Sequence, residues 1–180
     1  MAFPYRLPDL DLTAPFDRHR ASVRPEWIDA NGHMNVGYYL VAFDHATDTF
    51  CEQLGIAWSY VEHRLGMVFI LEAHATFARE LKAGDPIRIT TQLLAHDEKR
   101  LHLFHVMHHG TEGWPAATNE LLMMHIDFET RRASPWPEET TRRLDALAQT
   151  HGRLARPAEA GRIIGLTRAT PAPPAPLENP

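Results

Sequence analysis

One stretch of the sequence, residues 36–54, constrains the fold more than any other, because its apolar side chains recur at helical spacing. The apolar positions are Tyr39, Phe43, Ala46, Phe50 and Leu54, and an acidic stripe of Asp44, Asp48 and Glu52 occupies another side. Gly55 follows at once, and glycine is the residue type that most often ends a helix. The pattern predicts one amphipathic helix of about five turns with a single buried face.

The segments after this helix have the character of β-strands. Four runs rich in β-branched and aromatic residues are separated by turn-forming residues, at 67–81, 86–95, 101–109 and 115–130. Three other elements are predicted: a strand at 19–28, a short helix at 58–65 and a weaker amphipathic helix at 138–149. This order predicts an α+β fold in which a curved antiparallel sheet wraps around one long central helix. Such a sheet has exposed edge strands, so we expect dimerisation through the sheet.

The chain divides into one domain and two flanking segments. Residues 1–18 contain three prolines without periodicity and are predicted to be an N-terminal arm on the surface. Residues 19–152 are predicted to form the single domain, including its C-terminal helix. Residues 153–180 are polar and rich in proline, and we expect an extended or disordered tail.

Composition excludes several classes of protein. A net charge of −5 and a pI near 6.2 argue against a nucleic-acid-binding protein, because phosphate contacts need a basic surface. No run of 18 apolar residues is present, so no membrane span is expected. Cys51 is the single cysteine and cannot form an internal disulfide, which favours a reducing, cytoplasmic location. We expect Cys51, within the long helix, to be a buried and inert thiol.

The chemistry is concentrated in the segment that leads into the long helix, Asp-Ala-Asn-Gly-His-Met-Asn at 29–35. Asn35 is a candidate N-cap. The amides of Val36, Gly37 and Tyr38 would then point out of the helix start, at the partially positive end of the helix dipole, which suits an oxyanion. Asp29 supplies a carboxylate close by. A base or nucleophile beside an anion hole is the minimum equipment for acyl transfer.

The segments 27–29, 32–35 and Tyr38-Tyr39, followed by the helix and the strands, resemble hotdog-fold thioesterases of the 4-hydroxybenzoyl-CoA thioesterase-like group. The resemblance covers about residues 19–132 and implies an acyl-CoA thioesterase that acts as a homodimer or a dimer of dimers. It implies that Asp29 is the nucleophile or general base and that the helix start around Gly37 polarises the thioester carbonyl. Asn31 and His33 match a variant of the family in which Asn and His assist the acid. Coenzyme A is part of the substrate, and no metal or redox cofactor is expected.

A narrower likeness is to betainyl-CoA thioesterases of carnitine breakdown. It is carried by the segments 71–77, 81–85, 91–94, 97–105 and 122–127, whereas Thr118-Asn119-Glu120 replaces the glutamate–glutamine pair expected there. The likeness suggests a short or polar acyl-CoA, with betainyl-CoA as the particular candidate. Proteins hold a quaternary ammonium with aromatic faces and a nearby carboxylate. The candidate carboxylate is Glu72, and the candidate faces are Trp27, Tyr38, Tyr39, Trp58, Tyr60 and Trp114.

Glu72 is a further catalytic candidate, because it interrupts an apolar strand and a carboxylate there must be paired or solvated by a cleft. Strand alternation puts Glu72 and His74 on one face and Ala73 and Ala75 on the other. The alternative is an ion pair with Arg79 or with a neighbouring chain.

Basic and histidine residues further along the chain suggest weaker sites. Lys99 and Arg100 at a predicted hairpin are candidates to contact the phosphates of CoA, against the default of solvated surface charge. The spacing of His102, His105 and His108 invites a metal interpretation, but alternation puts His105 on the opposite face from the other two. We therefore expect no metal site.

Two other functions remain compatible with these residues. A hydratase or dehydratase of the same fold, acting on acyl-CoA or acyl-carrier protein, pairs a histidine with a carboxylate near the helix start, and His33 could fill that role. A non-catalytic module that binds an acyl-thioester would need no acid–base pair at all.

Overall fold

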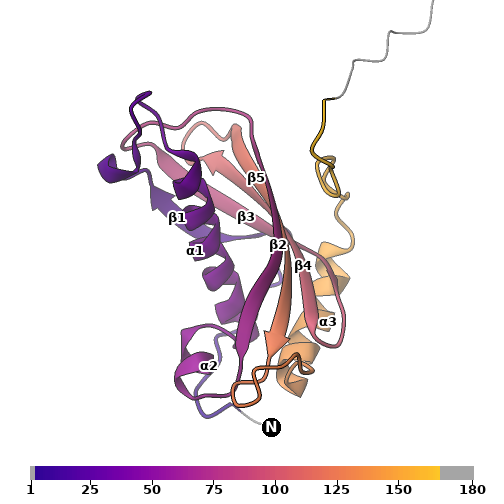
Figure 1. Ribbon diagram of the computed structural model, residues 1–180. Helices are drawn as coiled ribbons and strands as arrows, with labels where there is room; N and C mark the ends of the chain where they lie inside the picture. The colour runs from indigo at the N-terminus through magenta and orange to yellow at the C-terminus, as the bar shows by residue number, and fades with distance from the viewer. Residues whose placement is uncertain (1–2, 167–180) are drawn as a thin grey trace, which may run out of the picture.

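The computed structural model describes residues 3–166 and shows one antiparallel sheet packed against a long helix (Figure 1). The elements are β1 (Phe16–Ser22), the 3₁₀ helix η1 (Pro25–Trp27), α1 (Val36–Leu54), α2 (Trp58–Glu62), β2 (Met67–Phe77), β3 (Pro86–His96), β4 (Arg100–His109), β5 (Pro115–Ile126) and α3 (Glu138–His151). The strand order in the sheet is β1-β3-β4-β5-β2. The α+β architecture predicted from the sequence is thus confirmed.

Helix α1 has the predicted bounds because both of its ends are capped. The Asn35 side chain accepts a hydrogen bond from the Gly37 amide at 2.9 Å. Gly55 adopts φ 75°, a left-handed conformation in which glycine has no Cβ to strain. The apolar face of the helix, including Phe43, Ala46 and Phe50, is buried against the sheet.

Several predicted element bounds were wrong at their ends. Strand β1 begins at Phe16 rather than His19, because Phe16 is buried in the core against Phe50. The segment after it turns into η1 at Pro25, whose fixed φ suits the first position of a helix. Strand β5 ends at Ile126, because the next residues form a turn in which the Thr130 amide donates to the Asp127 carboxylate at 2.7 Å.

The two edges of the sheet differ in character. Strand β1 carries charged side chains, and Arg18 and Arg20 form ion pairs there. Strand β2 instead exposes apolar side chains along an edge that pairs only with β5: Phe69, Ile70, Leu71 and Phe77 are each at least 40% exposed. A long apolar edge is a template for pairing with another chain.

The segment after α3 crosses the face of the sheet that points away from α1. There the side-chain amide of Gln92 donates to the carbonyl of Ala155 at 3.4 Å, and the Gly161 amide donates to the Glu120 carboxylate at 2.7 Å. The part of the expected tail at 167–180 lies outside the described residues. Within residues 3–166, no helix is both long enough and apolar enough to cross a membrane.

Candidate active site

The segment that precedes α1 is a compact loop closed by its own backbone. Ile28 and Met34 form an isolated antiparallel bridge. Inside it, the Asp29 amide donates to the His33 carbonyl at 3.1 Å, and the Gly32 amide donates to the Asp29 carbonyl at 3.0 Å. Gly32 has φ +82°, a conformation that this tight turn requires and that a side chain would strain. The loop therefore holds Asp29 and His33 side by side.

The Asp29 carboxylate is partly buried and only partly hydrogen-bonded. Its Oδ1 accepts the Asn31 amide at 2.8 Å and lies 3.9 Å from Nδ1 of His33. The described residues provide no donor to its Oδ2. The side chain is 22% exposed, so one carboxylate oxygen remains available to a substrate or a water molecule. His33 is close enough to interact electrostatically with Asp29, although 3.9 Å is too long for a hydrogen bond.

The start of α1 is less open than the sequence suggested. The expectation that three consecutive amides are free was wrong for two of them. The Gly37 amide is bound by the Asn35 side chain, and the Tyr38 amide donates to the Asn35 carbonyl at 3.0 Å. The Val36 amide has no acceptor among the described residues. A Cβ on Gly37 would lie 3.3 Å from the Asn35 carboxamide oxygen, so glycine leaves room for the cap at this position.

A cavity of about 350 Å³ adjoins Asp29, with one wall from the loop and α1 and the other from the end of β2. Asp29, His33 and Val36 line the first wall, and Phe77 and Arg79 line the second. Tyr39 lies between the walls, where its hydroxyl accepts the Leu81 amide at 3.2 Å and its ring meets Phe77 edge-on. Phe77 was not predicted as a site residue, although it ends both an apolar strand and the segment 71–77 that carries the narrower likeness.

Arg79 is held in this wall of the cavity by the aromatic ring of Trp114. Its guanidinium carbon lies 3.9 Å from the centre of the Trp114 ring, a cation–π contact. The predicted alternative for Glu72, an ion pair with Arg79, is absent from the ion pairs found within residues 3–166.

The side chains of Asn31 and Glu72, two other predicted catalytic residues, do not reach the Asp29 cavity within the chain. Asn31 is exposed and does not line the cavity; its contribution is the backbone amide that binds Asp29. Glu72 lies on the sheet face opposite α1, in a separate cavity of about 380 Å³ that it shares with His102 and Glu120. Those two residues pair with each other at 2.7 Å. A single chain thus does not bring Glu72 to Asp29, and its catalytic role stays a prediction.

Lys99 and Arg100 lie at the opposite end of β4 from the Asp29 cavity. Strand β4 begins at Arg100 and ends at His109, which stacks on Trp114 beside Arg79, so its length of about 30 Å separates the hairpin from the cavity. Arg100 is already paired with Asp97 at 2.6 Å, and this guanidinium lowers the pKa of the Asp97 carboxyl to about 2. Their contact with CoA from the same chain is therefore not supported by the geometry.

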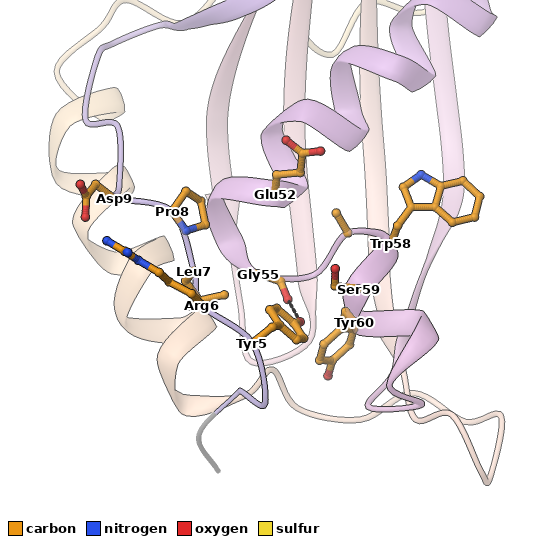
Figure 2. Close-up of a pocket in the computed structure, with 11 residues that line it drawn as sticks. Tyr5, Arg6, Leu7, Pro8, Asp9, Glu52, Gly55, Trp58, Ser59 and Tyr60 are labelled. Carbon is orange, nitrogen blue, oxygen red and sulfur yellow. Dashed lines mark hydrogen bonds between the residues drawn. The ribbon is translucent and has the colours of Figure 1, made fainter.

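A larger cavity, of about 590 Å³, lies at the other end of α1 (Figure 2). The N-terminal arm forms one side of it, where the Tyr5 hydroxyl donates to the Gly55 carbonyl at 2.7 Å. Figure 2 shows the Trp58 indole pointing away from this arm. The cavity contains Glu52 but no residue of the loop at 28–34, so it does not belong to the Asp29 site. No cluster of His, Cys, Asp or Glu within residues 3–166 is arranged to hold a metal ion.

This fold agrees with comparisons to known proteins. Residues 23–144 match the family model described as the thioesterase-like superfamily. The match spans more than half of the chain, and the chain belongs to this family.

Two named relatives show which members of the family this chain resembles. The betainyl-CoA thioesterase of Pseudomonas aeruginosa is 36% identical over 148 residues, which cover 82% of this chain and 93% of that protein. The L-carnitine dehydrogenase/betainyl-CoA thioesterase of Rhizobium meliloti is 34% identical over 159 residues, covering 88% of this chain but only 32% of that longer protein. The narrower likeness seen in the sequence is thus confirmed as a similarity to such enzymes.

A solved structure shows the same fold. A hypothetical protein of Staphylococcus aureus, determined in complex with CoA, superposes with a TM-score of 0.77 at 30% identity, covering 86% of this chain and 99% of that one. These comparisons confirm the predicted hotdog fold. They also confirm the prediction of a thioester hydrolase that acts on acyl-CoA. The hydratase and the non-catalytic module receive no support from them.

Proposed function

We propose that this protein hydrolyses betainyl-CoA to betaine and CoA, with Asp29 as the catalytic carboxylate. The observation that carries the proposal is the partly exposed Asp29 carboxylate in a cavity at the start of α1, within a chain 36% identical to a betainyl-CoA thioesterase. The reducing cytoplasm, where acyl-CoA esters occur, is the proposed location and suits the free, buried Cys51.

The proposed reaction places the thioester carbonyl between Asp29 and the helix start. Asp29 either attacks the carbonyl carbon or takes a proton from the attacking water, and both roles need the ionised carboxylate. The positive end of α1 and the Val36 amide stabilise the oxyanion, and the Gly37 amide can share its hydrogen bond with it. The C–S bond breaks, the CoA thiolate leaves and takes up a proton, and water supplies the new carboxylate oxygen. The stoichiometry requires no metal and no redox cofactor.

The test is release of free thiol from purified protein and a panel of acyl-CoA esters. We expect kcat/KM for betainyl-CoA to exceed that for acetyl-CoA and butanoyl-CoA by about tenfold or more, because a site that binds a cation rejects neutral groups. The panel includes 3,3-dimethylbutanoyl-CoA, which has the shape of the betainyl group without its charge. Absence of thiol release from betainyl-CoA, with release from other esters, would overturn the substrate and retain the enzyme class.

We further propose that the active form is a homodimer joined along β2, alone or as half of a dimer of dimers. The outer edge of β2 is unpaired among residues 3–166 and exposes Phe69, Ile70, Leu71 and Phe77. Val36, Leu40 and Val41 on α1 are exposed as well. Two copies related by a twofold axis would pair these edges in antiparallel fashion and cover the apolar side chains of both.

Replacing Leu71 with glutamate should make the protein monomeric. Leu71 is 48% exposed on β2, and in the dimer a glutamate there would meet the corresponding glutamate near the twofold axis, where two buried carboxylates are unfavourable. Sedimentation velocity at micromolar concentration measures the outcome. Leu12→Glu is the matched control, because Leu12 is equally exposed (46%) but lies on the N-terminal arm. A wild-type monomer, or a dimer that survives Leu71→Glu, would contradict this interface.

A further inference from the structure

A small cavity lies beside the second half of α1 and is not used by the site already described. It has a volume of about 180 Å³, is open to solvent on one side and is bordered by α1, α2 and the beginning of β2. Asp44 and Asp48 line it from α1, Trp58 lines it from α2, and Ile70 contributes from β2. It therefore combines two carboxylates and an indole with apolar walls, and it is called the acidic cavity below.

The carboxylates in this cavity have no cationic partner. Asp44 and Asp48 are one helical turn apart, and neither takes part in an ion pair among the described residues. Burial raises the pKa of the Asp48 carboxyl and the neighbouring Asp44 raises it further, whereas His45 and a hydrogen bond with the Trp58 side chain partly offset this rise. Negative charge that is only partly compensated at a half-buried position is unfavourable for the free protein, and a bound cation would relieve it.

The Trp58 indole is also unusual for its position. It is 70% exposed, the largest exposure of any aromatic side chain among the exposed large hydrophobic residues described. Its ring points away from the N-terminal arm (Figure 2). An exposed indole near two carboxylates has the chemistry that binds a quaternary ammonium group, which cannot donate a hydrogen bond and is held by charge and by aromatic faces.

Within one chain this cavity is too far from Asp29 to hold the same acyl group. The Asp29 cavity meets Phe77 at the end of β2, whereas the acidic cavity meets Val68 and Ile70 at its beginning. Phe77 lies nine positions after Val68 along the extended strand, which corresponds to about 30 Å. The betainyl group is far shorter than this distance.

A twofold dimer removes the separation. Helix α1 runs antiparallel to β2, because its first residues lie near the end of the strand and its second half near the beginning. If two β2 edges pair in antiparallel fashion about their middle, near Glu72, the beginning of one β2 lies beside the end of the other. The acidic cavity of one copy then adjoins the Asp29 cavity of the other.

We propose that Asp48 and Trp58 of one copy, with Asp44 beside them, bind the quaternary ammonium of the acyl group whose thioester lies at Asp29 of the other copy. This inference rests on the proposed hydrolysis of betainyl-CoA and on the dimer along β2. It assigns the selectivity for a cationic acyl group to residues outside the loop at 28–34.

The first experiment measures selectivity for the charge of the acyl group. For Asp48→Asn, we expect the ratio of kcat/KM for betainyl-CoA to that for 3,3-dimethylbutanoyl-CoA to fall about thirtyfold, since the carboxylate attracts only the cation. The neutral ester should be hydrolysed faster by the variant, because no charge is then desolvated beside its methyl groups. Trp58→Leu should lower the same ratio about tenfold, and Trp58→Phe should restore part of it.

Glu52→Gln is the matched control for the selectivity measurement. Glu52 lies one turn further along α1 and carries the same charge, but it lines the other cavity and not the acidic one. Its selectivity ratio should stay within about twofold of the wild-type value. A ratio that is equal in Asp48→Asn and the wild type would overturn the inference while leaving betainyl-CoA hydrolysis intact. A wild type inactive on betainyl-CoA would overturn the proposed function itself.

The second experiment asks which copy supplies Asp48. Chains with Asp29→Asn and chains with Asp48→Asn are co-expressed with different affinity tags, and mixed dimers are purified through both tags. Each mixed dimer contains one site with intact Asp29 from one chain and intact Asp48 from the other. We expect about half of the wild-type kcat/KM per dimer on betainyl-CoA, well above either parent. Activity no higher than that of the Asp48→Asn parent would show that Asp48 acts within its own chain and would overturn the proposal.

Discussion

Replacing Asp29 with asparagine should lower kcat for thioester hydrolysis about a thousandfold, the effect expected when the group that attacks or activates water is neutralised. KM should change much less, because the substitution changes only the group beside the thioester and not the surface that binds the CoA portion of the substrate. The measurement is steady-state release of thiol from betainyl-CoA and from a neutral acyl-CoA, and both substrates should lose activity to a similar degree.

The fold should tolerate this substitution. The hydrogen bond that Asp29 makes inside its loop is accepted by Oδ1 from the Asn31 amide, and the carboxamide oxygen of asparagine can accept it equally. The thermal midpoint of Asp29→Asn should therefore lie within a few degrees of the wild type. Glu26→Gln is the control, since Glu26 is an exposed carboxylate on η1 that does not line the cavity. Unchanged kcat in Asp29→Asn would remove Asp29 from the mechanism.

A single-turnover reaction in ¹⁸O-labelled water separates the two roles of the carboxylate. Direct attack forms an anhydride between Asp29 and the acyl group. If water then attacks the Asp29 carbonyl of that anhydride, the label enters Asp29 and an unlabelled oxygen leaves with the product. If Asp29 instead activates water, the label enters only the product acid. Attack of water at the acyl carbonyl of the anhydride also labels only the product, so trapping of the anhydride distinguishes that route.

The long helix and its caps could be predicted because their determinants are local. The apolar spacing of Tyr39, Phe43 and Phe50, the N-cap at Asn35 and the glycine at 55 all act within or next to residues 36–54. For the same reason Asp29 and His33 were predicted together, since they are neighbours in a short loop. The loop also shows what such a prediction omits. The Asn35 side chain that caps the helix accepts the hydrogen bond of the Gly37 amide, so this amide is not free for an oxyanion.

The surroundings of Glu72 could not be predicted in the same way. Alternation correctly grouped Glu72 with His74, as both line one cavity. Which face of β2 packs towards α1 depends on pairing with β5, where the register shifts between Ile70 and Glu72. That shift is set by a strand some fifty residues away in the chain. The same non-local pairing places Arg100 at the far end of the sheet from Asp29.

His105 illustrates a residue whose face could be predicted and whose partners could not. It is fully buried between β3 and α1, where Nδ1 lies 2.9 Å from the Thr91 hydroxyl and Nε2 lies 3.1 Å from the Thr47 hydroxyl. The Thr47 hydroxyl donates its proton to the Phe43 carbonyl and must accept from Nε2. This network assigns a neutral imidazole with its proton on Nε2 and with Nδ1 accepting from Thr91.

The buried ring should make the stability of the protein fall in mildly acidic solution. Burial lowers the pKa of His105 from 6.5 to about 3, so below pH 6.5 the unfolded chain binds a proton at this position that the folded chain does not. The free energy of unfolding therefore decreases as the pH falls from about 6.5 towards 3. Between pH 7.5 and pH 5.0 this one residue should lower it by about 2 kcal/mol.

Urea unfolding of the wild type and His105→Gln at both pH values, at one protein concentration, measures this contribution. The variant should be less stable than the wild type at pH 7.5 by about 1–3 kcal/mol, because a hydrogen bond to Thr47 or Thr91 is lost. It should nevertheless lose about 2 kcal/mol less than the wild type on going to pH 5.0, since glutamine takes up no proton in either state.

Burial also lowers the pKa of His125 and His151, but these residues are present in both proteins and cancel in the difference. His45→Gln, at an exposed position on α1, should keep the wild-type dependence on pH. Equal pH dependence in the wild type and His105→Gln would mean that His105 is protonated in the folded protein. The Thr47–His105–Thr91 network would then have to rearrange so that the Thr91 hydroxyl accepts a hydrogen bond from Nδ1.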